Sequence, residues 1–226
     1  MSLTSNLRQF QSAARLEQIL GSVHDNNNDF SWSAAIERDE KEQYPQRAVD
    51  FLNAVGMNRF YVPSEFGGRM EIGEELLYLH RVLARRDLTI NSTYSTNAWS
   101  VIVWIGGNAN QCQNIASRIL SGAAPALAYS EKAHGADLLS SEVTAQPAES
   151  KYILNGEKWS INRATLGDSL SLIAKTSNDR GPRSLSAFWL DKRHMVSKGT
   201  YSLNRLPTVG MRGLDISGIG FNNAEI

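Results

Sequence analysis

Two runs of sequence decide the fold. They read Ala126-Leu127-Ala128-Tyr129-Ser130-Glu131-Lys132-Ala133-His134-Gly135-Ala136-Asp137 and Tyr152-Ile153-Leu154-Asn155-Gly156-Glu157-Lys158-Trp159-Ser160-Ile161-Asn162. In the second run, Asn155-Gly156 can take the positive φ angles of a two-residue turn and is flanked by strand-forming residues, which predicts a β-hairpin. Before Pro125 the apolar residues recur every three or four positions, and after it they alternate, so the pattern changes from helix to strand.

The residues before Pro125 are predicted to be helical. Pro45 suits a first helical position, and Gly56 and Gly106-Gly107 are expected helix ends. Short connections between helices favour a compact antiparallel bundle over residues 1–124. The expected helices are an amphipathic segment from Leu3 to Leu20, then 45–56, 76–86, 91–105 and 109–120.

The residues from 125 to 226 are predicted to form a second, all-β domain. Apolar and polar residues alternate over 169–174, 184–189 and 201–205, and a Gly181-Pro182 turn separates the first two runs. Several short strands joined by polar turns favour an antiparallel barrel or sandwich. The fold class is therefore α+β, with a helical bundle followed by a β-domain.

Composition excludes several classes of protein. The 23 Lys and Arg residues balance the 23 Asp and Glu residues, so no basic field exists to bind nucleic acid. The single cysteine, Cys112, rules out an internal disulfide, and we expect it to be a buried apolar side chain. No signal peptide or membrane span is visible. A cytoplasmic protein is the expectation.

The order of motifs resembles that of the acyl-CoA dehydrogenases, a family of flavin enzymes. The residues that carry the resemblance are Gly56-Met57 with Tyr61 to Gly68, Gly106-Gly107-Asn108 with Gln111 and Leu120-Ser121-Gly122, the two runs quoted above, and Gly210-Met211-Arg212-Gly213 with Phe221. These motifs occur in the family's order and cover most of the chain. The resemblance implies that residues 125–226 correspond to the family's middle, flavin-binding domain.

The resemblance also implies an FAD cofactor and a set of binding residues. A flavin ring needs apolar walls, backbone amides and a few hydroxyl or amide groups. The implied cofactor-binding residues are Leu127, Tyr129, Ser130, Gly135, Ala136, Ser160, Ile161 and Asn162, and the implied substrate-binding residues are Ala136 and Lys132.

This sequence departs from the family at several of these positions. Ser160 stands where the family has a Trp beside the ring, unless Trp159 takes that place by a shift of register. Asn162 replaces a Thr or Ser at the reactive nitrogen, and its amide can still donate a hydrogen bond. Lys132 replaces a Pro and could meet a phosphate, although a solvated turn lysine is the alternative. Ala136 replaces a Ser.

Other polar residues in the turn are given structural roles. Glu131 and Asp137 are expected to hold the turn through hydrogen bonds to backbone groups. His134 could be an acid or base, but without a visible partner we interpret it as incidental. In the family the catalytic base is a Glu of a C-terminal helical domain, and no carboxylate here aligns with it. We therefore nominate no catalytic residue and no metal ligand.

Three function classes remain. The first is part of a flavin-dependent dehydrogenase that desaturates an acyl thioester, on coenzyme A or on an acyl carrier protein, with the C-terminal domain absent from this chain. The second is an oxidase or monooxygenase of the same fold. The third is a non-catalytic acyl-binding or assembly subunit. A barrel that normally packs on a helical domain would expose an apolar face, so a homo-oligomer or a partner chain is also expected.

Overall fold

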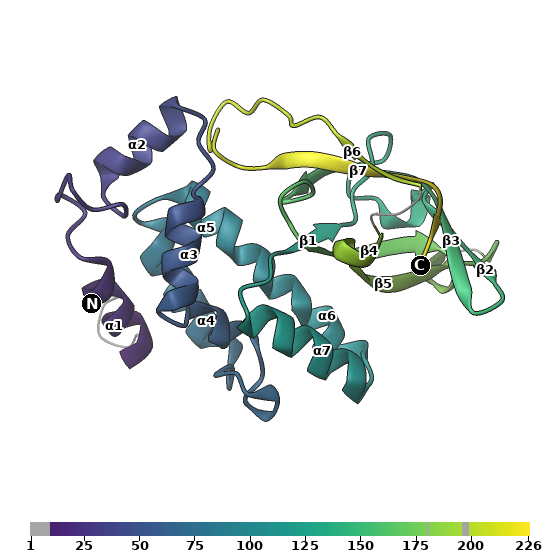
Figure 1. Cartoon of the computed structure of the whole chain (residues 1–226), viewed down its shortest axis with the longest axis horizontal. Coiled ribbons are helices and arrows are strands. Elements are labelled where there is room, and N and C mark those ends of the chain that lie inside the picture. The colour runs from purple at the N-terminus through teal and green to yellow at the C-terminus, as the bar shows by residue number, and fades with distance from the viewer. Residues whose placement is uncertain (1–9, 180, 196–198) are drawn as a thin grey trace, which may run out of the picture.

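A helical unit and a curled β-sheet lie side by side (Figure 1). The computed structural model describes residues 10–179, 181–195 and 199–226. Its α-helices are α1 (Gln11–Leu20), α2 (Trp32–Glu40), α3 (Gln46–Ala54), α4 (Gly73–Ala84), α5 (Leu88–Tyr94), α6 (Val101–Gly106), α7 (Ala109–Leu120) and α8 (Lys192–Met195). Its strands are β1 (Pro125–Ala128), β2 (Thr144–Ala148), β3 (Lys151–Asn162), β4 (Ser169–Lys175), β5 (Leu185–Asp191), β6 (Thr200–Leu203) and β7 (Ile216–Glu225).

Local capping groups set several helix boundaries. Asp87 accepts hydrogen bonds from the backbone N–H groups of Thr89 and Ile90 at the start of α5. Asn108 and Gln111 form a reciprocal capping box at the start of α7. Gly56, with φ of 80°, follows the end of α3. The helices predicted over 45–56, 76–86 and 109–120 are thus present.

Two helix predictions need correction. The segment expected to be one helix over 91–105 is α5, a 3-10 turn over Ser95–Ser100 and α6. The tighter turn breaks the helical period, so one apolar stripe does not run along the whole segment. The structure also contains α2, which the apolar pattern of the sequence does not predict. Residues 3–9 of the first predicted helix lie outside the described residues, and α1 covers its second half.

The sheet is mixed, which corrects the antiparallel prediction. In the described residues it has seven strands in the order β1-β4-β2-β3-β7-β6, with β5 also paired to β4. β1 pairs in parallel with β4, from Pro125 opposite Ser169 to Ala128 opposite Leu172. The remaining long pairings, β2 with β3, β3 with β7, β4 with β5 and β6 with β7, are antiparallel.

The hairpin predicted at Asn155-Gly156 is wrong. β3 runs unbroken through both residues, and the turn between β2 and β3 lies at Glu149-Ser150, where Glu149 has φ of 53°. Gly156 has φ of 116° and follows a β-bulge, in which Asn155 lies opposite both Asn222 and Asn223 of β7. A bulge and a tight turn need the same backbone freedom, so the local sequence did not separate them.

Each unit has its own core, and ion pairs join the two. The helical core includes Leu52, Leu83 and Ile119, and the sheet core includes Leu154 and Leu172, all at most 1% exposed. Arg118 of α7 lies 2.8 Å from Asp191 of β5. The loop between β6 and β7 reaches back to α2 (Figure 1), where Arg212 donates to Asp39 over 2.9 Å. None of the helices in the described ranges is long and apolar enough to cross a membrane.

Candidate functional site

The two sequence runs that carry the predicted flavin-binding residues meet in space. The backbone N–H of Trp159 in β3 donates to the carbonyl oxygen of Ser130, just after β1, over 3.0 Å. At the end of β3, the side-chain Nδ2 of Asn162 donates to the carbonyl oxygen of Ser92 in α5 over 2.9 Å. The outer face of β1 and β3 and the start of α5 therefore form one candidate site.

Leu127 of β1 and Tyr129, directly after the strand, face away from the sheet core. Ala126 and Ala128 are fully buried in the sheet core, so the residues between and after them face the opposite side. Leu127 is paired with Ser171 of β4, and both lie on this outer face. Burial raises the pKa of Tyr129, and a hydrogen bond with Ser171 partly opposes the rise. Leu127, Tyr129 and Ser130 are all half-buried.

At the end of β3 the three predicted residues lie in different environments. Ile161 is 2% exposed, and its side chain is in the sheet core, so it could offer only its backbone to a ligand. Ser160 is exposed in a β-bulge with φ of 63°. The Oδ1 atom of Asn162 is buried and has no hydrogen-bond partner among the described residues. A buried, unpaired carbonyl is a reason to look for a ligand donor there.

Trp159 lies beside the site on the outer face of the sheet. Its ring packs on Gly218 of β7, where an added Cβ would lie 2.5 Å from Trp159 Cε3. The bulge shifts the pairing between Trp159 and Ile161, so that Trp159 and not Ser160 is opposite Gly218. The structure thus places the aromatic ring of Trp159 next to Ser160, one residue before the position where a tryptophan was expected from the family resemblance.

The turn after β1 is open to solvent. Lys132, Gly135 and Ala136 are exposed, and the turn is closed by the backbone N–H of Gly135, which donates to the carbonyl oxygen of Glu131 over 2.8 Å. Lys132 has no hydrogen-bond or ion-pair partner within the described parts of the chain. A Cβ on Gly135 would have no heavy atom within 4 Å. The turn could therefore receive an anionic group without rearrangement.

Beneath the turn lies a buried ion pair that sequence reasoning missed. The Nζ of Lys158, which is fully buried, lies 2.7 Å from Glu131 Oε1 and 3.0 Å from the carbonyl oxygen of Tyr129. Glu131 also accepts from the backbone N–H groups of Glu142 and Val143, at 2.6 and 3.2 Å, which confirms its expected backbone role. The Ser141 hydroxyl donates to it as well.

The pKa directions of this pair follow from burial and hydrogen bonding. Burial would raise the pKa of Glu131, but the hydrogen bonds from Glu142, Lys158 and Ser141 together lower it. Burial lowers the pKa of Lys158, and Glu131 opposes that shift. The pair holds the turn onto β3 and therefore has a structural role.

Comparison with known families identifies the β-unit. Residues 126–224 match the family model described as acyl-CoA dehydrogenase, middle domain. The chain belongs to the acyl-CoA dehydrogenase family. The part of the chain that matches the family model begins at β1 and ends in β7, so both strands of the candidate site lie inside it.

Individual relatives agree with this family. The chain is 30% identical to the cyclohex-1-ene-1-carbonyl-CoA dehydrogenase of Geobacter metallireducens over 202 residues, which cover 85% of this chain and 50% of that protein. The FAD complex of PigA has the same fold, with a TM-score of 0.82 and 21% identity, and 98% of this chain covers 57% of it. The prolyl acyl carrier protein oxidase AnaB is also similar, with a TM-score of 0.79 and 19% identity, and 96% of this chain covers 57% of it. The chain spans about half the length of the curated relatives it matches.

His134 in this acyl-CoA dehydrogenase turn has an acidic neighbour, which corrects the expectation of no visible partner. Its Nε2 lies 3.0 Å from Glu142 Oε1, at ion-pair distance, but forms no hydrogen bond within the described residues. Glu131, His134 and Glu142 bring one ligand atom each within 4.8 Å of one another. Because Glu131 already neutralises Lys158, a metal ion there would be placed beside a buried ammonium group, so we assign no metal site.

Proposed function

We propose that this chain is the flavin-binding part of an FAD-dependent acyl-thioester dehydrogenase. The observation that carries the proposal is the junction of β1, β3 and α5, where Trp159 bonds to Ser130 and Asn162 bonds to Ser92, 70 positions away in the sequence. The FAD-containing relative of the same fold supports the cofactor. When bound, FAD supplies the two-electron acceptor for removing hydrogen from the acyl chain.

The residues present fit a flavin. The unpaired Oδ1 of Asn162 could accept a hydrogen bond from the edge of the ring, while its Nδ2 remains bound to Ser92. Leu127 and Tyr129 provide a partly apolar wall. In the open turn, the exposed ammonium of Lys132 and the backbone near Gly135 would meet the phosphates. The described residues offer no carboxylate at the site that we assign as the base.

Binding measurements with two flavins test this division of roles. We expect Asn162→Ala to lower the affinity for both FAD and riboflavin by about 5- to 10-fold, because one hydrogen bond is lost. Lys132→Gln should lower the affinity for FAD alone, because riboflavin has no phosphate. Asn178→Ala, an exposed residue of the β4–β5 connection, is the matched control. Equal loss of riboflavin and FAD affinity in Lys132→Gln would refute the assigned contact, and a folded chain that binds neither flavin would refute the cofactor.

The acyl carrier is the second part of the proposal. One relative is named as a dehydrogenase of a coenzyme A thioester, and another is named as an acyl carrier protein oxidase. We propose desaturation of a coenzyme A or carrier-protein thioester, with the same acyl group compared on both carriers in a turnover assay of the full-length protein. Formation of the 2-enoyl thioester supports dehydrogenation. Peroxide formation with air as the only electron acceptor would instead indicate the oxidase.

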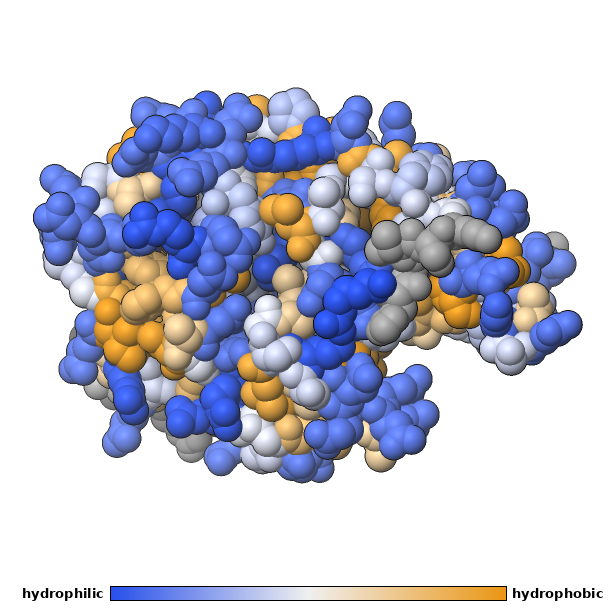
Figure 2. All heavy atoms as spheres, viewed as in Figure 1, coloured by the Kyte–Doolittle hydropathy of each residue, from blue (hydrophilic) through white to orange (hydrophobic). Residues whose placement is uncertain are grey.

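We also propose that the chain associates with a second chain or domain. Large apolar side chains are exposed on α1, on α3 and directly after α3, namely Ile19, Phe51 and Val55, and Figure 2 shows hydrophobic surface gathered in that region. Val209 and Met211 are exposed in the loop between β6 and β7. Such patches favour a protein contact. Sedimentation equilibrium tests it, and a strictly monomeric chain at all concentrations would contradict homo-oligomer formation.

A further inference from the structure

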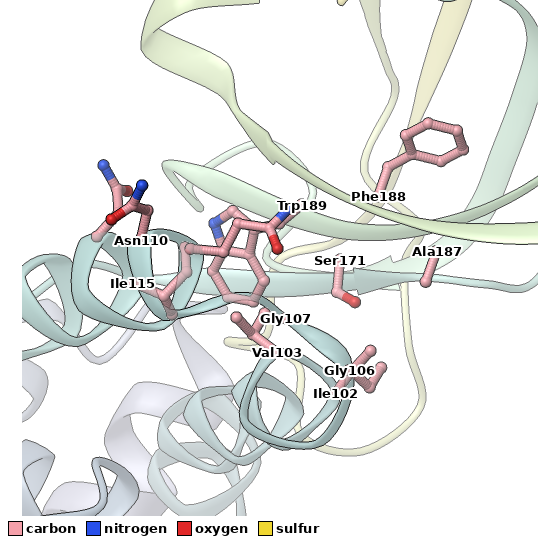
Figure 3. A pocket seen from close by; sticks show the side chains of 12 residues that line it. Ile102, Val103, Gly106, Gly107, Asn110, Ile115, Ser171, Ala187, Phe188 and Trp189 are labelled. Atoms are coloured by element: carbon pink, nitrogen blue, oxygen red, sulfur yellow. The ribbon is translucent and has the colours of Figure 1, made fainter. Parts of the chain in front are cut away.

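A cavity of about 390 Å³ lies between the helices α6 and α7 and the strands β4 and β5 (Figure 3). Its lining residues are Ile102, Val103, Gly106, Gly107, Asn110, Gln111, Asn114, Ile115, Ser171, Ala187, Phe188 and Trp189. None of them is among the residues predicted to bind flavin. The cavity adjoins the candidate flavin site through Ser171, which pairs with Leu127, but the two share no predicted binding residue.

The chemistry of the lining restricts what could bind. None of the lining residues carries a formal charge, and the wall is formed largely by Ile102, Val103, Ile115 and Trp189. A charged ligand would lose its hydration there without gaining an opposite charge. The size lies in the range of small-molecule sites. The cavity thus favours an uncharged molecule with a substantial apolar part.

Polar groups at the cavity define the rest of the ligand. Asn110 and Asn114 are one helical turn apart on α7, both are exposed, and neither carboxamide has a hydrogen-bond partner among the described residues. Gln111 is different, because its Oε1 accepts from the backbone N–H of Asn108 in the capping box. Two free carboxamides on one face of α7 can bind an amide or ester group as donors and as acceptors.

Trp189 supplies an independent observation. Its indole Nε1–H is buried and lacks an acceptor within the described chain, although an indole N–H usually has one. Figure 3 shows the Trp189 ring lying toward Ile115 and the side chains of α7, with Ser171 and Ala187 also pointing toward the helices. A carbonyl oxygen is the acceptor that this donor lacks.

We propose that this cavity binds an uncharged, mostly apolar molecule that carries an amide or ester group. The apolar part lies against Ile102, Val103 and Ile115. The carbonyl group lies between the Asn110 and Asn114 carboxamides and the Trp189 indole. The inference does not depend on flavin binding.

N-butylhexanamide is the probe for the test, and the indole N–H resonance of Trp189 in the ¹⁵N-labelled chain is the readout. Trp189→Phe assigns that resonance. Saturable binding with a downfield shift of the Trp189 N–H is expected. Undecane, which has no acceptor, should produce no such shift. Undecanoate should bind at least about 10-fold more weakly than the amide, because its charge would be buried without a partner.

Variants locate the site. Ala187→Phe places a large side chain in the cavity from an exposed position and should lower the affinity for the amide by about 10-fold or more. Asn110→Ala or Asn114→Ala should lower that affinity by about 3- to 10-fold. Ile105 lies on the exposed side of α6 and does not line the cavity. Ile105→Phe should therefore change the affinity for the amide by less than about 2-fold, because any effect would come from a few weak contacts. Equal binding of undecanoate, an unaffected Ala187→Phe variant, or displacement of the amide by riboflavin would each overturn the proposal.

Discussion

Replacing Lys158 by Met tests whether the buried ion pair holds the turn onto β3. The change keeps an unbranched side chain of similar length but leaves the carboxylate of Glu131, which is 6% exposed, without its cation. Removing one partner of a buried pair typically costs about 3–5 kcal/mol. Glu131 keeps hydrogen bonds from Ser141, Glu142 and Val143, so we expect the lower end, about 3 kcal/mol of unfolding free energy.

The same strand provides the control. Lys151 pairs with Glu225 over 2.6 Å, close to the 2.7 Å between Lys158 and Glu131. The side chains of Lys151 and Glu225 are, however, 54% and 60% exposed. Lys151→Met should therefore cost no more than about 1 kcal/mol. Urea unfolding followed by circular dichroism compares the two variants. If Lys158→Met is no less stable than Lys151→Met, the reasoning from burial is wrong.

Three further predictions follow from packing and protonation. Gly218→Ala should destabilise the chain by about 1–3 kcal/mol, because the new Cβ would overlap Trp159, whereas Gly73→Ala meets no atom within 4 Å and should be neutral or stabilising in thermal unfolding. Cys112, at 4% exposure, should react with a thiol reagent only as fast as the chain opens, so a fast reaction in the native protein would contradict its burial. The pKa of Glu131 is lowered on folding, so its ionised carboxylate stabilises the folded chain. This stabilisation is fully present above the unfolded pKa of about 4.3 and is lost as the pH falls through the pKa of the folded state. The difference in stability between the wild type and Glu131→Gln should narrow below that pH, and a difference that widens would contradict the sign.

The sequence predicted the helices best where one apolar stripe and a cap coincide. α7 has both, with Ile115 and Ile119 buried and the Asn108 cap at its start. The prediction over 91–105 failed because buried polar residues such as Thr96 and Ser100 bond to backbone carbonyls one turn earlier, which favours the 3-10 geometry. That preference depends on packing against β1 and is not visible in the apolar period.

The β-unit was harder to predict because its pairings are distant in sequence. Alternation gave β4 and β5, but nothing local indicates that β1 would pair in parallel with β4 some 40 residues later. The family resemblance indicated the candidate site, where Ser130 bonds to Trp159 of β3 and Asn162 bonds to Ser92 of α5. The buried pair of Lys158 and Glu131 was missed, because a lysine in an alternating strand normally indicates a solvent-exposed position.

The position of β7 affects how the chain can be synthesised. This strand, which includes residue 225, is not at the sheet edge but lies between β3 and β6. During synthesis on the ribosome, one edge of β3 stays unpaired until β7 has been synthesised, whereas the helices α1 to α7 are synthesised before any strand. An exposed edge of this length invites pairing with another nascent chain. Protection of the unpaired edge during translation is therefore a requirement of this topology.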